Sequence, residues 1–422
     1  MRVVHIGYNV DGGAGLGMIR LHRDLLTQGV QSRVLCMKRG KEESVSKFPP
    51  SLRRRGRNRN IPFLLLHALR IWDSPYYRAL RMATALKEKY GRTVSSPFST
   101  YPVEEHPLVR KADVIHLHWV SNFVDLPSFL KTIRKPVVWT IRDENPFLGY
   151  WHFRCDIPDD LLDSERREDE WLRAEKLRAI RSCQTLAFAS LSRATDDFVA
   201  SCPAAEGRFH CVIPNSVDGV AFHPADGAAV RREYGIGPDT KLLVFVSQGL
   251  HDPRKGLPDL LEAVSSMART DIAILCVGSG RPTPLPKNVR VMLEGRVTET
   301  ERLSALFSAA DLFVTPSHAE TFGKTTTEAL ACGTPVVSYP NAGAMDIVGS
   351  EDGVLAADFT ADALRAAIAE ALSRRFDREA LRARVLDRFS PVRVTNAYVR
   401  LYERLLSGPA DGNCPPPLDE ST

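Results

Sequence analysis

The stretch SHAETFGKTTTEALACGTPVV, residues 317–337, carries the signals that decide the fold. Two carboxylates in it, Glu320 and Glu328, lie eight positions apart with a Phe-Gly-Lys turn between them. Apolar residues at helical spacing follow, and Gly-Thr-Pro then ends the predicted helix and leads into a strand. We expect the helix to begin near Gly323, so that its free backbone N–H groups open beside Glu320 and favour a phosphate. The stretch therefore predicts a sugar-nucleotide site; the alternative is a surface helix with two solvated glutamates.

The same stretch resembles the E-x7-E segment of the retaining, family 4 glycosyltransferases, which have the GT-B fold. The resemblance implies two Rossmann-like, doubly wound α/β domains facing a cleft. It implies that Glu320 holds the hydroxyls of the donor sugar and that Glu328 binds the ribose. It also implies that Phe322, Gly323 and Lys324 lie at the donor, where backbone amides take up the charge of the leaving diphosphate.

Length, charge and cysteine usage limit the class of protein. A chain of 422 residues is too long for one ordinary core and indicates two domains. The net charge of +5 is mildly basic, so we expect no nucleic-acid partner. The eight cysteines form no C-x-x-C pair, as in reduced cytosolic proteins. The chain begins with a strand rather than a signal peptide, and no apolar run approaches the roughly 18 residues of a membrane span. We expect the protein in the cytoplasm, with peripheral contact to the cytoplasmic membrane face as a second option.

A glycine loop follows the first predicted strand, residues 2–7. A predicted helix and a second strand come after the loop, so this is a right-handed βαβ unit. The dinucleotide fingerprint G-x-G-x-x-G fails because Met18 stands where its last glycine would be. By resemblance, Gly12 and Gly13 match the Gly-Gly loop that family 4 enzymes place opposite the donor diphosphate. The alternative is a tight turn that binds no ligand.

A basic run at residues 53–59 is followed by a short apolar stretch at 63–72. Basic residues beside an amphipathic stretch can lie on an anionic membrane surface, and many family 4 enzymes glycosylate lipid-linked acceptors. The other interpretation is a solvated loop and helix.

The buried strand predicted at residues 112–120 ends in two histidines. Alternation puts His116 and His118 on one face, and His118 stands at the end where α/β sheets present ligand groups. By resemblance, His118 contacts the donor sugar near the reacting carbon and is a candidate catalytic residue. The alternative for His118, and more so for His116, is a structural histidine with satisfied hydrogen bonds. No third ligand at suitable spacing is evident from the sequence, so we predict no metal site.

The next strand, residues 136–141, runs into Arg142 and Asp143. Many relatives have T-x-H-D here, so an arginine stands in this chain where they have a histidine. An arginine at this point could grip a carboxylate or a phosphate of the acceptor.

The second half of the chain contains the remaining donor-binding candidates. Residues 212–218, VIPNSVD, resemble the segment that begins the second domain of the family. Lys255 matches the lysine that neutralises the donor phosphate. The usual arginine of a G-R-L element is absent, and Arg254 or Arg281 is a candidate substitute. Val297 lies in the segment where backbone atoms of relatives meet the base.

We expect four segments and one reaction. The segments are an N-terminal acceptor-side domain (1–205), a C-terminal nucleotide-sugar-binding domain (206–390), a helix crossing back (391–408) and a disordered tail (409–422). The reaction is transfer of a hexosyl group from a UDP- or GDP-sugar to a hydroxyl of a glycan or lipid-linked acceptor, with no cofactor and no required metal. The setting implied by resemblance is cell-surface polysaccharide or lipid-linked oligosaccharide assembly. Two alternatives remain: another GT-B enzyme, such as a sugar-nucleotide epimerase or a phosphorylase, and a non-catalytic binding protein on this fold.

Overall fold

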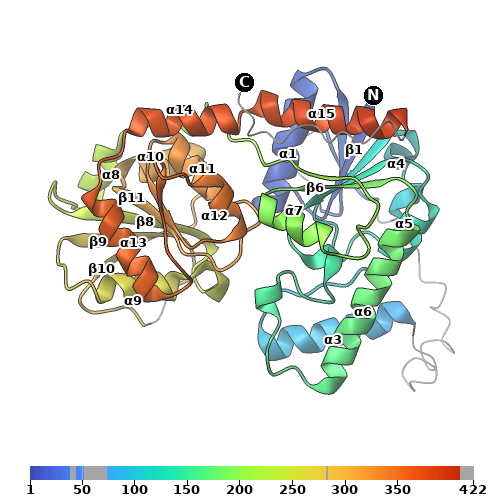
Figure 1. Ribbon diagram of the computed structural model, residues 1–422, viewed down its shortest axis with the longest axis horizontal. Helices are drawn as coiled ribbons and strands as arrows, with labels where there is room; N and C mark the ends of the chain where they lie inside the picture. Colours follow the sequence, from blue (N-terminus) through green and yellow to red (C-terminus); the bar gives the residue numbers. More distant parts are fainter. Residues whose placement is uncertain (39–43, 50, 52–73, 282–283, 409–422) are drawn as a thin grey trace. The chain divides into compact units, whose positions relative to one another are not determined.

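The computed structural model describes residues 1–38, 44–49, 51, 74–281 and 284–408 (Figure 1). These residues form two compact units, and each is described by itself. Among these, the first contains residues 1–191, 195–213 and 395–408, and the second contains 192–194 and 214–394. The sequence predicts the boundary at 205/206, whereas the structure passes from one unit to the other between Ile213 and Pro214. The predicted tail, the basic run at 53–59 and the apolar stretch at 63–72 lie outside the described residues.

The first unit is built on a seven-stranded sheet in which all neighbouring strands are parallel. The order is β3-β2-β1-β4-β5-β6-β7, so the chain builds outward from β1 in one direction and then returns to β4 and builds in the other. A reversal of this kind is the topological switch point of a doubly wound fold, and it lies between β1 and β4. The strands are β1 (Arg2–Gly7), β2 (Gln31–Cys36), β3 (Val45–Lys47), β4 (Val114–Leu117), β5 (Val137–Ile141), β6 (Leu186–Ser190) and β7 (His210–Val212).

Side-chain alternation divides the first sheet into an apolar face and a face that carries polar groups. Val4 and Ile6 point to the apolar face, which packs on α4, α5 and α6. His5 points to the other face, where α15 reaches the sheet through Tyr398 and Tyr402. The helices and short 3-10 turns of this unit are α1 (Gly12–Thr27), α3 (Pro75–Tyr90), η2 (Val103–Glu105), α4 (Pro107–Lys111), α5 (Leu126–Thr132), η3 (Asn145–Phe147), η4 (Arg154–Asp156), α6 (Asp163–Ser182), α7 (Arg193–Ala200) and α15 (Pro391–Ser407).

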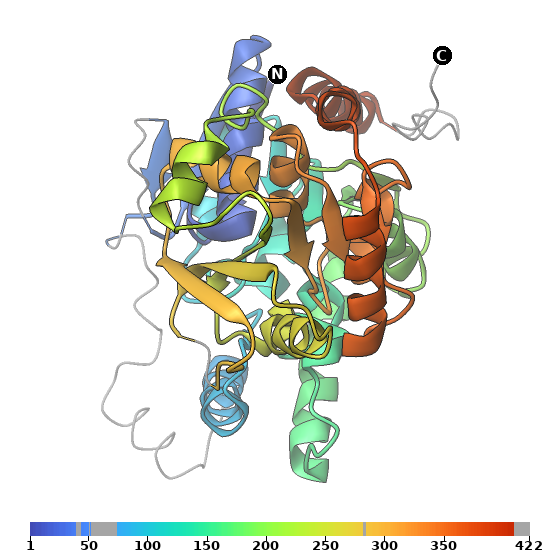
Figure 2. The ribbon, with the colours of Figure 1, turned by 90° about the vertical axis from the view of Figure 1, so that its left-hand side faces the viewer.

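The second unit repeats the plan with a six-stranded parallel sheet in the order β10-β9-β8-β11-β12-β13. Its switch point lies between β8 and β11, because the chain builds from β8 to β10 and then returns to β11. Figure 2 shows these strands with helices along their sides. The strands are β8 (Lys241–Gly249), β9 (Ile272–Ser279), β10 (Arg290–Gly295), β11 (Leu312–Thr315), β12 (Val336–Ser338) and β13 (Gly353–Leu355).

Apolar helix faces cover this second sheet. Leu257 and Leu260 of α9 and Leu364 of α13 are fully buried in one core cluster with strand residues such as Phe245 and Val314. The helices and the 3-10 turn are α8 (Gly227–Glu233), η5 (Pro253–Lys255), α9 (Leu257–Ser265), α10 (Thr300–Ala309), α11 (Lys324–Ala331), α12 (Ala342–Ile347), α13 (Ala361–Ser373) and α14 (Arg378–Arg388).

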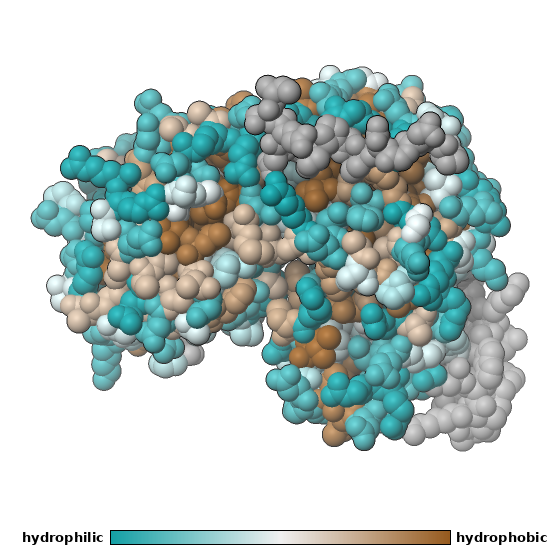
Figure 3. All heavy atoms as spheres, in the orientation of Figure 1, coloured by the Kyte–Doolittle hydropathy of each residue, from teal (hydrophilic) through white to brown (hydrophobic). Residues whose placement is uncertain are grey.

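The structure confirms two Rossmann-like, doubly wound units. The helix predicted to begin near Gly323 is α11, with Gly323 as its N-cap. The strongly charged segment at 165–181 lies in α6, where Figure 3 shows a mostly hydrophilic surface. No helix in the described part of the chain is long and apolar enough to span a bilayer.

Candidate active site

Two predicted donor-binding residues of the second unit, Lys255 and Glu320, meet at its switch point. Lys255 lies in η5, which follows β8, and Glu320 lies in the loop that follows β11. β8 and β11 are neighbours, and the chain leaves them toward different halves of the sheet. In doubly wound folds, ligands bind at such a point, outside the carboxyl ends of the strands. The Lys255 ammonium donates a short hydrogen bond to Glu320 Oε1 within an ion pair. About a fifth to a quarter of each side chain is exposed, so ligands can reach both charges.

A glycine makes this pairing possible. Gly256 follows Lys255 with φ of +71°, and a Cβ atom there would lie 1.9 Å from the Pro316 carbonyl oxygen. Only glycine therefore lets the η5 turn pack directly on the end of β11. The close approach brings Lys255 within reach of the loop that carries Glu320.

Glu320 is held in its charged form although it is partly buried. Burial raises the pKa of the carboxyl, but the charges of Lys255 and Arg254 and hydrogen bonds from Lys255 and Ser317 outweigh burial and leave the pKa below its ordinary value. Arg254, one of the two predicted substitutes for the missing family arginine, donates from Nη1 to the Ala319 carbonyl at 3.3 Å. Both basic candidates thus lie beside the Glu320 loop.

The other candidates of the E-x7-E segment surround the start of α11. Gly323 caps this helix in the left-handed region (φ 87°), and no side chain caps its N-terminus. Glu328 is 6% exposed, and Lys324 Nζ lies 3.8 Å from its Oε1. The Phe322 ring is buried and packs edge-on against Phe389 at 5.4 Å, so a donor would meet only the backbone of Phe322.

Val297 lies farther along the same edge of the sheet. It follows β10, which is separated from β8 by β9, and its side chain is half-buried. The structure thus brings Lys255, Glu320, Arg254 and the start of α11 together, and it places Val297 two strands away at the same carboxyl edge.

In the first unit, Gly12, Gly13 and His118 also flank a switch point. The two glycines follow β1 and begin α1, and His118 follows β4. Gly12 has φ of 71°, whereas a Cβ atom on Gly13 would meet nothing within 4 Å. Packing therefore does not require a glycine at position 13.

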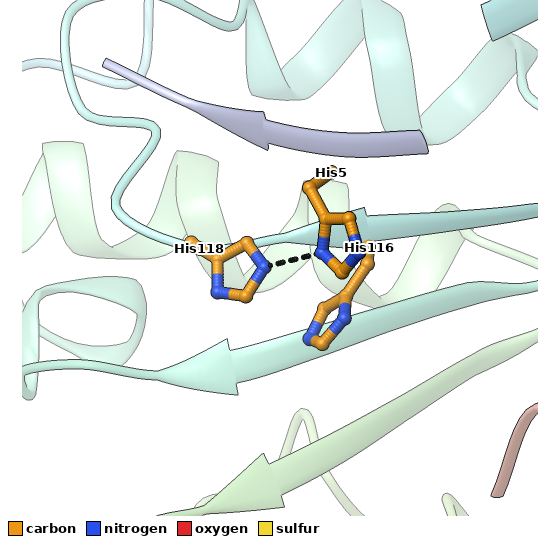
Figure 4. Close-up of side chains that lie close together, drawn as sticks. All are labelled: His5, His116 and His118. Atoms are coloured by element: carbon orange, nitrogen blue, oxygen red, sulfur yellow. Dashed lines mark hydrogen bonds between the residues drawn. The ribbon is translucent and has the colours of Figure 1, made fainter. Parts of the chain in front are cut away.

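His118 is buried, and both of its ring nitrogens are engaged. Figure 4 shows the contact with His5. Arg142 Nη2 lies 3.1 Å from Nδ1, and His5 Nδ1 lies 2.9 Å from Nε2. Because arginine only donates, His118 accepts at Nδ1 and its proton lies on Nε2, which donates to His5. The proton of His5 then lies on Nε2, which has no partner among the described residues. Arg142 thus orients His118, and its role as a grip for an acceptor anion stays a prediction.

His116 and His118 share one face, as predicted, with ring centroids 4.1 Å apart. His116 Nδ1 is 2.7 Å from the Tyr402 hydroxyl, and Nε2 is 2.7 Å from Thr140 Oγ1. Burial is the largest cause that lowers the pKa of His5, His116 and His118 well below the ordinary value. Interactions with neighbouring histidines and with the Arg142 cation lower it further. All three imidazoles are therefore neutral.

The sequence offered no third ligand for the histidine pair, but the structure supplies one. Nitrogen atoms of His5, His116 and His118 lie within 4.8 Å of one another, because His5 and His116 are partners in the β1–β4 register. Imidazole nitrogens suit Zn²⁺, but hydrogen bonds occupy both nitrogens of His116 and of His118, and the Arg142 cation lies against the cluster. A hydrogen-bonded network accounts for these contacts without a metal. Strand register is not readable from the sequence, so His5 was missed.

A pocket within the first unit adjoins this network. Its lining includes His118, Trp119, Arg142, Asp143 and Asn145. Asp143 Oδ2 accepts from Trp119 Nε1 at 2.7 Å and pairs with His152 Nδ1 at 2.5 Å. Polar groups from the segments that follow β4 and β5 therefore converge at the same end of the sheet as His118. His152 was missed because it lies nine residues beyond Asp143 in an irregular segment.

Comparison with known proteins gives a family match that lies within the second unit. Residues 240–374 match the family model described as Glycosyl transferases group 1. The D-inositol 3-phosphate glycosyltransferase of Segniliparus rotundus is 34% identical over 176 residues, which span 38% of this chain and 39% of that protein. The protein of the same description from Geodermatophilus obscurus is 34% identical over 152 residues, or 32% and 33% of the two chains. The chain thus matches only about two fifths or less of the length of these curated relatives.

Solved structures resemble nearly the whole chain. Sucrose-phosphate synthase from Thermosynechococcus elongatus has a TM-score of 0.65 at 19% identity and covers 97% of this chain and 100% of its own. HepE from Anabaena, in complex with UDP and glucose, has a TM-score of 0.63 at 18% identity, with 96% and 99% covered. Residues 240–374 thus resemble the glycosyl transferases group 1 family, and the two units of the chain have the GT-B fold.

Proposed function

We propose that the chain is a retaining glycosyltransferase that moves a hexosyl group from a UDP- or GDP-sugar to an acceptor hydroxyl. The observation that carries this proposal is the Lys255–Glu320 pair at the switch point of the second unit. A phosphate needs a cation, a sugar needs hydrogen-bond acceptors, and this partly exposed pair supplies both side by side. The match of residues 240–374 to the group 1 model supports the same reading.

The proposed reaction breaks the bond between the anomeric carbon and the diphosphate oxygen. Negative charge grows on the leaving diphosphate, and Lys255 with the backbone amides at Gly12, Gly13, Gly323 and Lys324 would stabilise it. The Lys255–Glu320 pair would open as the donor enters, and each charge would exchange its partner for a group of the donor.

The acidic pair would act on the two sugars of the donor. Glu320, whose pKa lies below its ordinary value, would stay charged, bind the hexosyl hydroxyls and favour positive charge at the anomeric carbon. Glu328 would hold the ribose hydroxyls, and Val297 would contact the base. His118 would contact the donor sugar through the part of its ring that lines the first-unit pocket.

Retention of configuration is proposed to follow from a front-face substitution. The acceptor oxygen would form its bond to the anomeric carbon on the face that the diphosphate leaves. The acceptor proton would pass to an oxygen of the departing phosphate, so no protein nucleophile is needed. Activity should persist in EDTA, because the charges that stabilise the leaving group belong to the chain.

The proposed acceptor is a glycan or a lipid-linked sugar, in cell-surface polysaccharide or lipid-linked oligosaccharide assembly at the cytoplasmic face of a membrane. D-inositol 3-phosphate is a second acceptor to test, since the curated relatives carry that name. UDP is the first donor nucleotide to test, since HepE was solved with UDP and glucose.

A thermal-shift screen with UDP, GDP, ADP and dTDP tests the proposal. We expect one nucleotide to raise the melting temperature, and the matching nucleotide sugar to be consumed only with acceptor, apart from slow hydrolysis. NMR of the product should show the anomeric configuration of the donor. Interconversion of nucleotide sugars without acceptor would indicate an epimerase instead. Unchanged cellular function in a Glu320→Ala strain would indicate a non-catalytic protein.

A further inference from the structure

The loop that carries Glu320 is tied to α9 by a second pair that the proposed reaction does not use. His318 Nε2 lies 2.9 Å from Asp259 Oδ2, and Asp259 lies in the first turn of α9. Because a carboxylate accepts, His318 carries a proton on Nε2 and donates it. The Tyr339 hydroxyl donates to the same oxygen at 2.9 Å. The His318 ring also lies against Tyr339 and Phe359, with centroids 5.3 and 6.0 Å away.

The loop has ties on two sides, and they differ in what holds them. Toward α12, Asn341 Nδ2 donates to the Ser317 carbonyl at 2.9 Å and Gly343 N donates to the Glu320 carbonyl at 3.0 Å. Toward η5 and α9, the ties are the Lys255–Glu320 pair, the His318–Asp259 pair and two hydrogen bonds between Arg254 and the loop backbone.

Donor binding removes one of the ties toward α9. Under the proposed function, Lys255 binds the diphosphate and Glu320 binds the sugar, so these two charges no longer bind each other. The diphosphate and the sugar belong to one molecule, and the distance between the two segments must then fit that molecule. The His318–Asp259 pair is independent of both charges and can keep the segments in register.

We propose that His318 is a positioning residue, which keeps the Glu320 loop docked on α9 while the donor occupies Lys255 and Glu320. The inference rests on the proposed function. We call the His318–Asp259 pair the brace. The helix α9 is anchored by Leu257 and Leu260, both fully buried, so loss of the brace moves the loop and leaves Lys255 in place. His318 therefore acts on the sugar through Glu320 and has little effect on the diphosphate.

The test compares an intact donor with its own diphosphate. Dissociation constants are measured by calorimetry for UDP-glucose against UDP and for GDP-mannose against GDP. For the nucleotide that binds, His318→Ala should weaken binding of the nucleotide sugar by about tenfold, which is the effect of one hydrogen bond to a charged group. Binding of the free diphosphate should weaken by less than about threefold. His318→Gln, whose amide can donate from a similar position, should recover most of the loss. Asp259→Asn is a second variant that weakens the same bond at constant size.

A double-mutant cycle with Glu320 and a control at a similar His–Asp pair test whether the effect of His318→Ala passes through Glu320. In the Glu320→Gln background, His318→Ala should cause less than about a twofold further change, because its effect passes through Glu320. His210→Ala breaks another half-exposed His–Asp pair of the same length, 2.9 Å to Asp196 in the first unit, and should leave both dissociation constants unchanged.

Two outcomes separate the brace from the proposed function. If the wild-type chain binds a nucleotide sugar and His318→Ala binds it equally well, the brace is wrong and the glycosyltransferase proposal stands. Equal weakening of the sugar and the diphosphate would also overturn the brace, since it would indicate general damage. If the wild-type chain binds none of the four ligands, the proposed function is overturned and the brace with it.

Discussion

The two units place very different side chains at the same topological position. In the first unit, the switch point between β1 and β4 is filled by neutral, buried histidines that hydrogen-bond to one another, to Arg142 and to Tyr402. In the second, the switch point between β8 and β11 holds the charged, partly exposed pair Lys255–Glu320. Identical winding therefore does not assign identical chemistry.

The difference follows from how far each switch point is exposed to water. A buried imidazole pays for desolvation when it is charged, so the first switch point keeps its groups neutral. Lys255 and Glu320 remain reachable from solvent and carry opposite charges. A diphosphate can therefore replace Glu320 as the partner of Lys255, and sugar hydroxyls can replace Lys255 as the partner of Glu320. We infer that the first switch point chiefly shapes and stabilises its unit, whereas the second carries the charge for the reaction.

The largest expected effect is on the second switch point. Glu320→Gln should lower kcat of transfer by about 10²- to 10³-fold, because it removes charge aimed at the reacting carbon. Stability should change by only about 1 kcal/mol or less, since the pair is partly exposed. Initial rates and thermal melts measure both. Asp362→Asn breaks the exposed pair with Arg365 in α13 and should leave kcat unchanged. A Glu320→Gln enzyme with more than half of the wild-type kcat would contradict this contrast.

The next effect concerns the acid stability of the first unit. Burial lowers the pKa of His5, His116 and His118, so between pH 6.5 and 5 the unfolded chain binds more protons than the folded unit. The free energy of unfolding should therefore fall as the pH drops below about 6.5, by up to roughly 1 kcal/mol per pH unit for each of these histidines. Urea titrations read by tryptophan fluorescence measure this unit alone, because all five tryptophans lie within residues 1–191.

Two comparisons isolate the histidines in that experiment. His5→Asn keeps an acceptor for the His118 proton but cannot be protonated, so its pH dependence should be shallower. Lys176, whose pKa burial lowers to about 7, changes its proton binding on folding only above that value and leaves the acid window unaffected. A wild-type unfolding free energy that stays flat from pH 6.5 to 5 would show that the histidines are not held neutral.

Much of the fold was predictable because local patterns determine it. The strand, glycine loop and helix at residues 2–27 and the Gly-Thr-Pro stop after α11 identify doubly wound units without knowledge of long-range contacts. The E-x7-E segment likewise predicted that a helix begins near Gly323, just after Glu320 in the chain, and α11 does so. The domain boundary was placed eight residues early, because the segment at 206–213 contains β7, a three-residue strand that belongs to the first sheet.

The parts of the sites that were missed depend on register and side-chain packing. His5 joins His116 only through the pairing of β1 with β4, 111 positions apart in sequence. Tyr402 reaches His116 from the far end of the chain. The burial of the Phe322 ring against Phe389 likewise depends on a contact between distant segments. Spacing along the chain contains none of this information.

A smaller effect tests whether the first switch point is chiefly structural. Tyr402→Phe removes the hydroxyl that bonds His116 Nδ1 at 2.7 Å inside the core, and should lower the free energy of unfolding of the first unit by about 1–2 kcal/mol. Its kcat/KM should stay within about twofold of wild type, opposite in pattern to Glu320→Gln. Tyr90→Phe, which removes a half-buried hydroxyl bonded to Glu165 at 2.9 Å, should cost about 0.5 kcal/mol. A large loss of activity in Tyr402→Phe at unchanged stability would show that the histidine network acts in the reaction.

The smallest effect is expected for Gly13→Ala, which tests whether the glycine loop of the first unit contacts the donor. A Cβ atom on Gly13 would meet nothing within 4 Å, so Gly13→Ala should keep the stability of the first unit and could raise it slightly, since alanine favours a helix. If backbone amides there approach a diphosphate, the added methyl group should weaken nucleotide-sugar binding by about threefold. Gly15→Ala is the matched control, because its Cβ would lie 2.4 Å from the Val10 carbonyl carbon and should destabilise the unit. Unchanged affinity in a stable Gly13→Ala protein would mean that the donor is bound by the charged switch point without this loop, and the two switch points would then differ in ligand as well as in charge.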